Sequence, residues 1–238
     1  MSDAPASARR GGGIPWGRII AEALLIFGSV YLAIFLEGRS QDRREEREAR
    51  EALVQLLLEL HADEVNLAEI QRSQLAISQE YLRINRWLGD PASVPGDSLT
   101  ASLNFVTTDN RTLFPRKGAW NTMVAAGQLV DLDNPELVTR LANLYENVVP
   151  RLEYNGRYYD ADLSMITNQV IVGTWDSYNR RFSPGGEVEM VRLREAILRL
   201  YNGWNLYYLD LLDEYEDLLE SSTAAIEAFL GAEIEASR

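Results

Sequence analysis

The longest apolar stretch of the chain runs from Ile19 to Leu36 and is interrupted only by Glu22. Eighteen residues in a helix rise about 27 Å, close to the thickness of the hydrocarbon core of a bilayer. A cleaved signal peptide would have a shorter apolar stretch followed by a small-x-small site, whereas here the charged sequence GRSQDRREER follows. The pattern therefore predicts an uncleaved transmembrane helix over residues 16–37, preceded by a flexible polar tail at residues 1–15.

A second helical pattern follows, because neither Gly nor Pro interrupts the chain from Arg39 to Leu88. Opposite charges at helical spacing, such as Arg43 and Glu46, favour a solvated first part of this helix. Apolar residues then recur on one stripe, which comprises Leu53, Leu56, Leu60, Leu67, Ile70, Ile77, Tyr81, Ile84 and Leu88. The spacing predicts that the membrane helix continues as one stalk helix through residues 38–90. The stripe fits the core of an antiparallel bundle, with a parallel coiled-coil dimer as the alternative.

Turn residues divide the rest of the chain, residues 91–238, into shorter helical segments. Asp97 or Ser98 is expected to cap a short helix, and a loop is expected over residues 107–117. A helix over Gly118–Ala126 should end at Gly127, which fits the left-handed position after a helix.

The sequence Asn134-Pro135-Glu136 predicts the cap and first turn of the next helix. Pro150 should kink or split that helix. Helical patterns resume over Leu152–Asn179 and Glu187–Ala236, the latter weakened at Asn202-Gly203. No segment shows the sustained alternation of a strand. The prediction is an all-α fold in which four to six helices form a helical-bundle domain.

Charge excludes one class of partner. The chain carries a net charge of −13, and residues 52–238 hold 15 basic and 28 acidic side chains. Nucleic acid needs a basic face, so it is not expected as a partner. The absence of cysteine excludes disulfides, thiolate metal sites and thiol nucleophiles, and it fits either side of a membrane.

The predicted membrane helix carries its own candidate contacts. Glu22 lies about one turn inside the apolar run, where it can reach the interface or pair with a partner's cation. Gly28, Ser29 and Ala33 are small and would let another helix approach closely. The aromatic side chains of Trp16 and Tyr31 suit the membrane interface.

The sequence contains no constellation that predicts catalysis. The helical pattern around the single histidine, His61, predicts a helix residue rather than a metal ligand or a base. The acids Asp210, Asp213, Glu214, Glu216 and Asp217 lie in a helical pattern and lack the glycine turn of a calcium loop. No G-x-S-x-G nucleophile elbow is present. We expect no enzyme activity, no cofactor, no metal site and no small-molecule ligand.

Aromatic residues are concentrated in the last third of the chain, and most should lie in the core. Tyrosine and tryptophan are also typical of protein contacts. The candidates for a partner surface are Tyr154, Tyr158, Trp175, Trp204 and Tyr208.

Two segments carry a resemblance: IIAEALLIFGSVYLAIFLEGRSQDRREEREAREALVQLLLELHADEVNL and AWNTMVAAGQLVDLDNPELVTRLANLYE. Together they resemble a broad group of uncharacterised bacterial proteins with one N-terminal membrane helix, a charged juxtamembrane stretch and a long amphipathic helix. The resemblance covers about a third of the chain. It implies a membrane-anchored helical domain with no established activity.

These features predict a non-enzymatic, single-pass accessory or scaffold subunit of a larger membrane complex, whether photosynthetic, respiratory, transport or secretory. Its expected partners are the membrane and other integral membrane subunits. The alternative is a ligand-sensing, membrane-anchored four-helix domain. The expected location is the bacterial inner membrane. Five Arg after the span against three before it favour a cytoplasmic domain, whereas a short basic tail before an uncleaved span is typical of export, and we expect a periplasmic domain.

Overall fold

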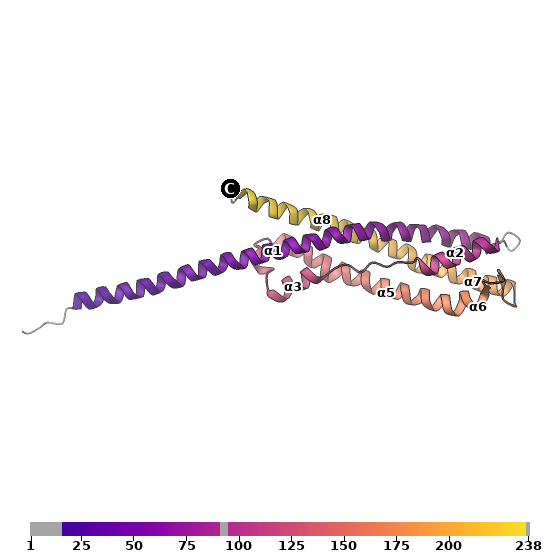
Figure 1. Cartoon of the computed structure of the whole chain (residues 1–238), viewed down its shortest axis with the longest axis horizontal. Helices are drawn as coiled ribbons and strands as arrows, with labels where there is room; N and C mark the ends of the chain where they lie inside the picture. Colours follow the sequence, from indigo (N-terminus) through magenta and orange to yellow (C-terminus); the bar gives the residue numbers. More distant parts are fainter. Residues whose placement is uncertain (1–15, 91–94, 237–238) are drawn as a thin grey trace, which may run out of the picture. The chain divides into compact units, whose positions relative to one another are not determined.

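The structure is a computed structural model that describes residues 16–90 and 95–236; the side chains of residues 16–23, 26, 38, 40, 42 and 233–236 lie outside the described set. Helix α1 runs without a break from Trp16 to Trp87 (Figure 1). It ends immediately before the predicted turn at Gly89, so the prediction of one continuous helix is confirmed. The chain divides into two compact units, residues 1–47 and residues 48–238.

Within the second unit, the predicted apolar stripe of α1 forms part of the core. All nine stripe residues are at most 4% exposed, and Leu53, Leu56 and Leu60 are fully buried. Burial of a leucine side chain contributes about 1.5–3 kcal/mol relative to exposure. The stripe therefore packs within its own bundle, in agreement with the bundle interpretation rather than the coiled-coil alternative.

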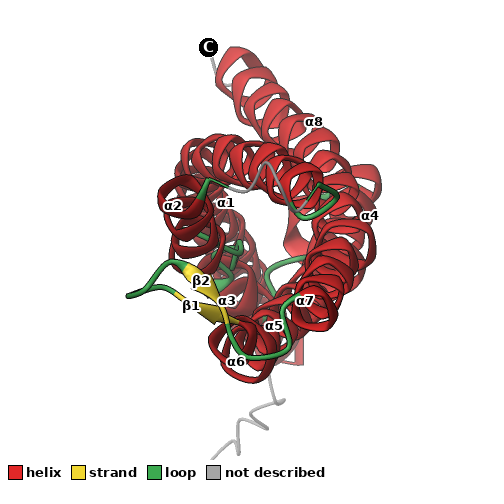
Figure 2. Cartoon of the chain, turned by 90° about the vertical axis from the view of Figure 1, so that its right-hand side faces the viewer, coloured by secondary structure: helices red, strands yellow, loops and turns green. Residues whose placement is uncertain are grey.

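The remaining elements are short helices, helical turns and one small hairpin. The α-helices are α2 (Gly96–Thr108), α3 (Gly118–Ala126), α4 (Pro135–Ala142), α5 (Val149–Ile166), α6 (Val172–Thr174), α7 (Glu187–Leu200) and α8 (Leu206–Ala236). A 3₁₀ turn, η2 (Val130–Leu132), and three π-helical turns, η3 (Asn143–Val148), η4 (Thr167–Ile171) and η5 (Tyr201–Asn205), connect them. Figure 2 shows the helices of the bundle grouped around a common centre. The predicted all-α fold class is confirmed.

Two of the three π-helical turns, η3 and η5, lie beside or at positions where the sequence predicted weak helix. Turn η3 ends at Val148, two residues before Pro150, which has no N–H to donate to a helical carbonyl. The wider turn shifts the register before the proline, so the helix is divided into α4 and α5 without a break in its path. Asn202-Gly203 likewise lies in η5, between α7 and α8.

Two predicted helix boundaries are confirmed by their backbone geometry. Gly127 adopts φ 73° after α3, and the N–H of Gln128 donates to the carbonyl of Met123 at 3.0 Å. Asn134 accepts the N–H of Leu137 through Oδ1 at 3.0 Å and so caps α4.

The predicted cap of α2 is wrong. Helix α2 begins at Gly96, so its cap position is Pro95, two to three residues earlier than expected, and Pro95 provides no side-chain acceptor. The carboxylate of Asp97 instead pairs with Arg180 at 2.5 Å. The local sequence pattern predicted Asp97 as the helix cap, but its side chain forms an ion pair with a residue distant in sequence.

The predicted helix over Leu152–Asn179 ends earlier, at Thr174, and gives way to a short hairpin. Strands β1 (Trp175–Asp176) and β2 (Arg181–Phe182) pair antiparallel. The carboxylate of Asp176 accepts the side-chain amide of Asn179 and the backbone N–H groups of Asn179 and Tyr178, which stabilises the turn. These hydrogen bonds, the one from the Asn179 side chain foremost, lower the pKa of Asp176. The hairpin packs on α2, because Trp175 Nε1 donates to Thr100 Oγ1 at 3.0 Å.

Candidate functional site

The first candidate site is the exposed apolar segment of α1 in the first unit, residues 24–36. Large apolar side chains are 51–74% exposed at Leu24, Leu25, Phe27, Val30, Tyr31, Leu32, Ile34, Phe35 and Leu36. Consecutive helical positions point about 100° apart, so this set surrounds the helix instead of forming one face. A helix that is apolar on all sides is stable only when something apolar covers it.

Four of the residues predicted to make contacts, Gly28, Ser29, Tyr31 and Ala33, lie within the described part of this segment. A side chain added at Gly28 would meet no atom within 4 Å, and Ser29 and Ala33 are exposed, so a partner can approach this face. Tyr31 is 73% exposed. The predictions for Trp16 and Glu22 concern side chains that lie outside the described residues.

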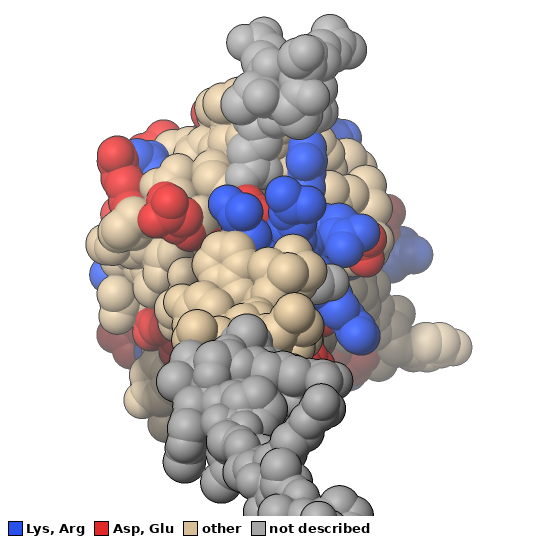
Figure 3. Space-filling model, turned by 90° about the vertical axis from the view of Figure 1, so that its left-hand side faces the viewer, with Lys and Arg blue, Asp and Glu red and all other residues tan. Residues whose placement is uncertain are grey.

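Arginine follows the apolar segment along α1. The guanidinium of Arg39 lies 5.6 Å from the centre of the Phe35 ring, and Arg47 Nε donates to the carbonyl of Arg43 at 2.9 Å. On the face shown in Figure 3, Lys and Arg side chains gather in one cluster with acidic side chains beside it.

Among the described residues, no helix contains an apolar stretch long enough to cross a membrane. The predicted span at residues 16–37 includes residues 16–23 and 26, whose side chains lie outside the described set.

The five aromatic residues predicted for a partner surface separate into two groups. Trp175 and Tyr208 are 4% and 1% exposed, and Trp204 is half-buried with its Nε1 donating to Asp162 at 2.8 Å. These three are packing residues of the bundle. Tyr154 and Tyr158 are 60% and 51% exposed, with ring centres 4.6 Å apart on α5, and only this pair lies on the surface.

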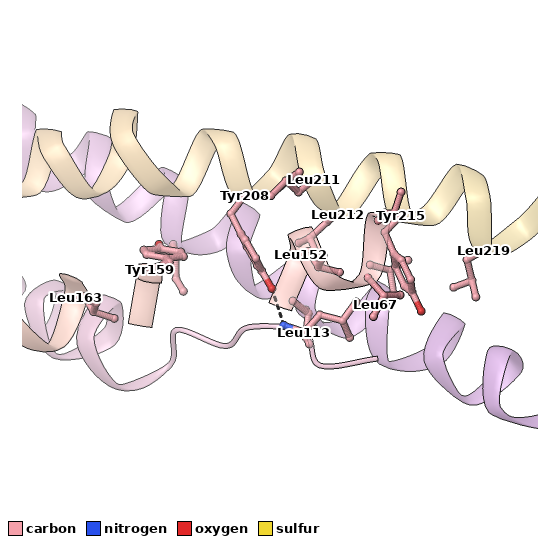
Figure 4. Close-up of a cluster of buried hydrophobic side chains, with 14 of the residues drawn as sticks. Leu67, Leu113, Leu152, Tyr159, Leu163, Tyr208, Leu211, Leu212, Tyr215 and Leu219 are labelled. Carbon is pink, nitrogen blue, oxygen red and sulfur yellow. Dashed lines mark hydrogen bonds between the residues drawn. The ribbon is translucent and has the colours of Figure 1, made fainter. Parts of the chain in front are cut away.

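The second candidate site is a polar layer inside the bundle, around the extended segment Asp109–Lys117. Tyr208 OH accepts the backbone N–H of Leu113 at 2.7 Å, within the leucine and tyrosine core shown in Figure 4. Gln74 Nε2 donates to Asn110 Oδ1 at 2.8 Å and to the Arg111 carbonyl at 2.6 Å. Buried side chains thus supply the hydrogen bonds that a backbone segment without secondary structure lacks.

Asp63 holds the end of this segment. It is 1% exposed, and its carboxylate accepts the backbone N–H of Arg116 at 2.8 Å and a guanidinium N–H of the same residue at 2.6 Å. Tyr215 OH donates to it at 3.3 Å. Burial raises the pKa of Asp63 above its usual value, although the contacts with Arg116 and Tyr215 act in the opposite direction.

The layer continues through tyrosine and amide side chains. Asn205 Nδ2 donates to Gln74 Oε1 at 2.9 Å, and the hydroxyls of Tyr81 and Tyr159 lie 3.4 Å apart. Burial raises the pKa of Tyr159 to about 12, so this phenol stays protonated and neutral near pH 7. These side chains hydrogen-bond to each other and to the backbone, so the layer stabilises the fold.

The remaining chemical candidates lie on the surface or pair locally. His61 Nε2 lies 3.5 Å from Glu227, and both side chains are about half exposed. In the acidic run of α8, Gln71 bonds Asp213 and Glu216, and Arg151 pairs with Glu214. Within the described residues, no three metal-ligating side chains are close enough together to hold an ion.

One open groove of about 830 Å³ lies between α4, η3 and α8. Its lining combines apolar surface with polar side chains and includes Glu136, Arg140, Asn143, Glu146 and Leu218. Glu146 already accepts Trp120 Nε1 at 2.8 Å, so this carboxylate is engaged in packing. The groove brings together no nucleophile and base.

Sequence reasoning missed the polar layer, although one signal was available. Asp63 and Gln74 stand at positions where the apolar stripe of α1 should continue. A polar residue at a core position of a helix indicates a buried hydrogen-bonding partner.

Comparison with known proteins identifies a family. The family model described as a family of unknown function, DUF6090, matches residues 22–173. No curated protein matches the chain. No solved structure matches it either. The expected membership of an uncharacterised family is confirmed. Because the match extends over more than half of the sequence, the chain belongs to the DUF6090 family.

Proposed function

We propose that the protein is a single-pass, membrane-anchored scaffold subunit without enzymatic activity. The N-terminal part of α1 serves as the anchor, and the helical bundle is the domain that it attaches to a larger membrane complex. The observation that carries the proposal is the apolar surface of residues 24–36, which surrounds the helix and is more than half exposed.

A bilayer is the environment that fits this surface. Soluble proteins seldom expose contiguous apolar patches of this kind, whereas lipid chains cover an apolar helix from all sides. The exposed apolar side chains of this segment extend to Leu36, and Arg39 and Arg43 follow within two turns. Long cationic side chains at that position can extend to the phosphate level of the membrane.

The buried polar layer supports a structural role for the domain. The hydrogen bonds of Asp63, Gln74 and Tyr208 go to backbone and side chains of the same bundle. A domain held in this way presents a fixed surface to its partners.

We place the anchor in the bacterial inner membrane with the bundle in the periplasm, because a short basic tail before an uncleaved apolar run is typical of export. Alkaline phosphatase fused after Arg238 should therefore be active in cells. An expressed but inactive fusion, together with activity of a cytoplasmic reporter at the same site, would place the bundle in the cytoplasm instead.

Contact with other integral membrane subunits is assigned to the small residues of the anchor. Substitution Gly28→Leu with Ser29→Leu adds bulk on the open face of the helix and keeps it apolar. Membrane insertion should be retained, and recovery of partner subunits in mild detergent should fall, because close helix approach is blocked. Leu24→Ile with Leu32→Ile is the matched control, and it should leave recovery unchanged. Full recovery with the bulky variant would move the contact to the bundle, where Tyr154 and Tyr158 are exposed.

A further inference from the structure

Helix α1 carries a second stripe in the bundle unit, and this one faces outward. The outer stripe comprises Val54, Leu58, His61, Val65, Ala68, Arg72, Leu75, Gln79 and Leu82. Its large apolar members are well exposed: 40% at Val54, 57% at Leu58, 74% at Val65, 52% at Leu75 and 42% at Leu82. Ala68, Arg72 and Gln79 are also exposed. The outer and buried stripes lie on the same uninterrupted helix, one or two positions apart along the sequence.

The spacing along the outer stripe is the spacing of a coiled-coil seam. Its residues are separated alternately by four and three positions through all nine members, which is a repeat of 3.5 residues. The stripe is about 42 Å long and extends over four heptads, the length at which such a repeat becomes informative. A partner with the same repeat in a long helix is the natural complement of this surface.

We propose that the outer stripe pairs with the same stripe of a second copy, as a parallel two-stranded coiled coil. This inference rests on the proposed membrane anchor. Two copies anchored through the start of α1 in one membrane have the same number of residues between anchor and stripe, which favours a parallel pair in register. Each seam residue then meets its own counterpart, which is the self-complementary contact of a two-fold dimer.

The polar members of the outer stripe fit a weak pair of defined register. Arg72 and Gln79 take one of the two seam positions, and His61 takes the other. Polar seam residues lower the stability of a coiled coil and restrict its register and number of strands. Confinement to one membrane raises the effective concentration of the helices, so a weak seam can still pair there.

Charged residues beside the seam affect the stability of this pair. Glu64 and Glu69 of opposite copies would approach each other across the pair, which is unfavourable. Glu69 is, however, already neutralised by Arg111, whose guanidinium lies 2.6 Å away. The pairing is therefore weakened by these acids without being prevented.

The chain contains no cysteine, so single cysteines report the pairing directly. In membranes that contain the full chain, Leu82→Cys and Val65→Cys should each form disulfide-linked dimers under mild oxidation. Val188→Cys is the matched control, because Val188 on α7 is 71% exposed and Val65 is 74% exposed. The seam variants should exceed this control by on the order of tenfold, the ratio that corresponds to ~1.4 kcal/mol of association.

A second pair of variants tests the seam itself. Leu58→Glu with Leu75→Glu, added to Leu82→Cys, should return cross-linking to the control level, because like charges would face each other in an apolar contact. Val188→Glu with Val191→Glu adds the same charge on α7 and should leave cross-linking unchanged. All four residues are exposed, so the bundle should fold in both variants.

The outcomes separate this inference from the proposed function. Protein that stays in the membrane after an alkaline wash, but whose Leu82→Cys variant does not cross-link above the control, overturns the dimer and retains the anchor. Cross-linking of Val65→Cys without Leu82→Cys overturns the parallel arrangement, because a parallel seam in register brings both positions against their own counterparts. Loss of the protein from the membrane overturns the anchor.

Discussion

Substitution of Leu25 and Leu32 by arginine should release the protein from the membrane. Both side chains are exposed, by 74% and 55%, so the change leaves the packing of the bundle intact. An arginine near the centre of a membrane helix costs about 2.5–3.5 kcal/mol, and two together cost roughly twice that. The variant should therefore appear in the supernatant after an alkaline wash, whereas the unmodified chain remains in the membrane pellet.

The matched control for this experiment is Leu25→Ile with Leu32→Ile, which keeps the segment apolar and should keep the protein in the pellet. Circular dichroism of both variants should show the same helical content. Retention of the arginine variant in washed membranes, with normal helicity, would show that residues 24–36 do not anchor the chain. The bundle would then be the part that holds it at the membrane.

Removal of the Asp63 carboxylate should produce the largest loss of stability in the bundle. In Asp63→Ala, the backbone N–H of Arg116 and the hydroxyl of Tyr215 both lose their acceptor inside the core. Loss of one partner of a buried ion pair typically costs about 3–5 kcal/mol. We expect about 2–3 kcal/mol, because the Arg116 side chain is 49% exposed and can be hydrated. The melting temperature should fall by roughly 5–10 °C.

Glu69→Ala is the control for Asp63→Ala. It also removes a carboxylate of α1 from an arginine of the extended segment, but this pair is exposed on both sides. An exposed ion pair contributes about 0–1 kcal/mol, so the melting temperature should change little. Equal effects of the two substitutions would contradict the assignment of Asp63 as the buried attachment of the segment.

The pH dependence of the same site has a definite sign. Because burial raises the pKa of Asp63, the folded state binds the proton more tightly than the unfolded chain. Stability from this group is fully present below the unfolded pKa and is lost as pH rises through the folded pKa. The melting temperature of the unmodified bundle minus that of Asp63→Asn should therefore decrease with rising pH above about 4. An increase over that range would indicate a lowered pKa.

Local sequence was sufficient for the features that depend on neighbours a few residues away. The absence of Gly and Pro between Arg39 and Leu88, with a regular apolar stripe, predicted the helix and its buried face. Gly127 and Asn134 were predictable for the same reason, because a left-handed residue and a helix cap are stabilised by contacts within one turn. These are interactions that any chain with the same short segment can make.

Only the tertiary structure decided which aromatic and polar side chains are inside. Tyr208 lies in the core because its hydroxyl accepts the N–H of Leu113, 95 positions away, whereas Tyr154 has no such neighbour and stays exposed. Asp97 pairs with Arg180 instead of capping α2, and Trp175 lies in a hairpin that packs against α2. The physical reason is common to all three cases: an amphipathic side chain is stable in water or in a core, and the choice depends on partners that the fold brings together from distant segments.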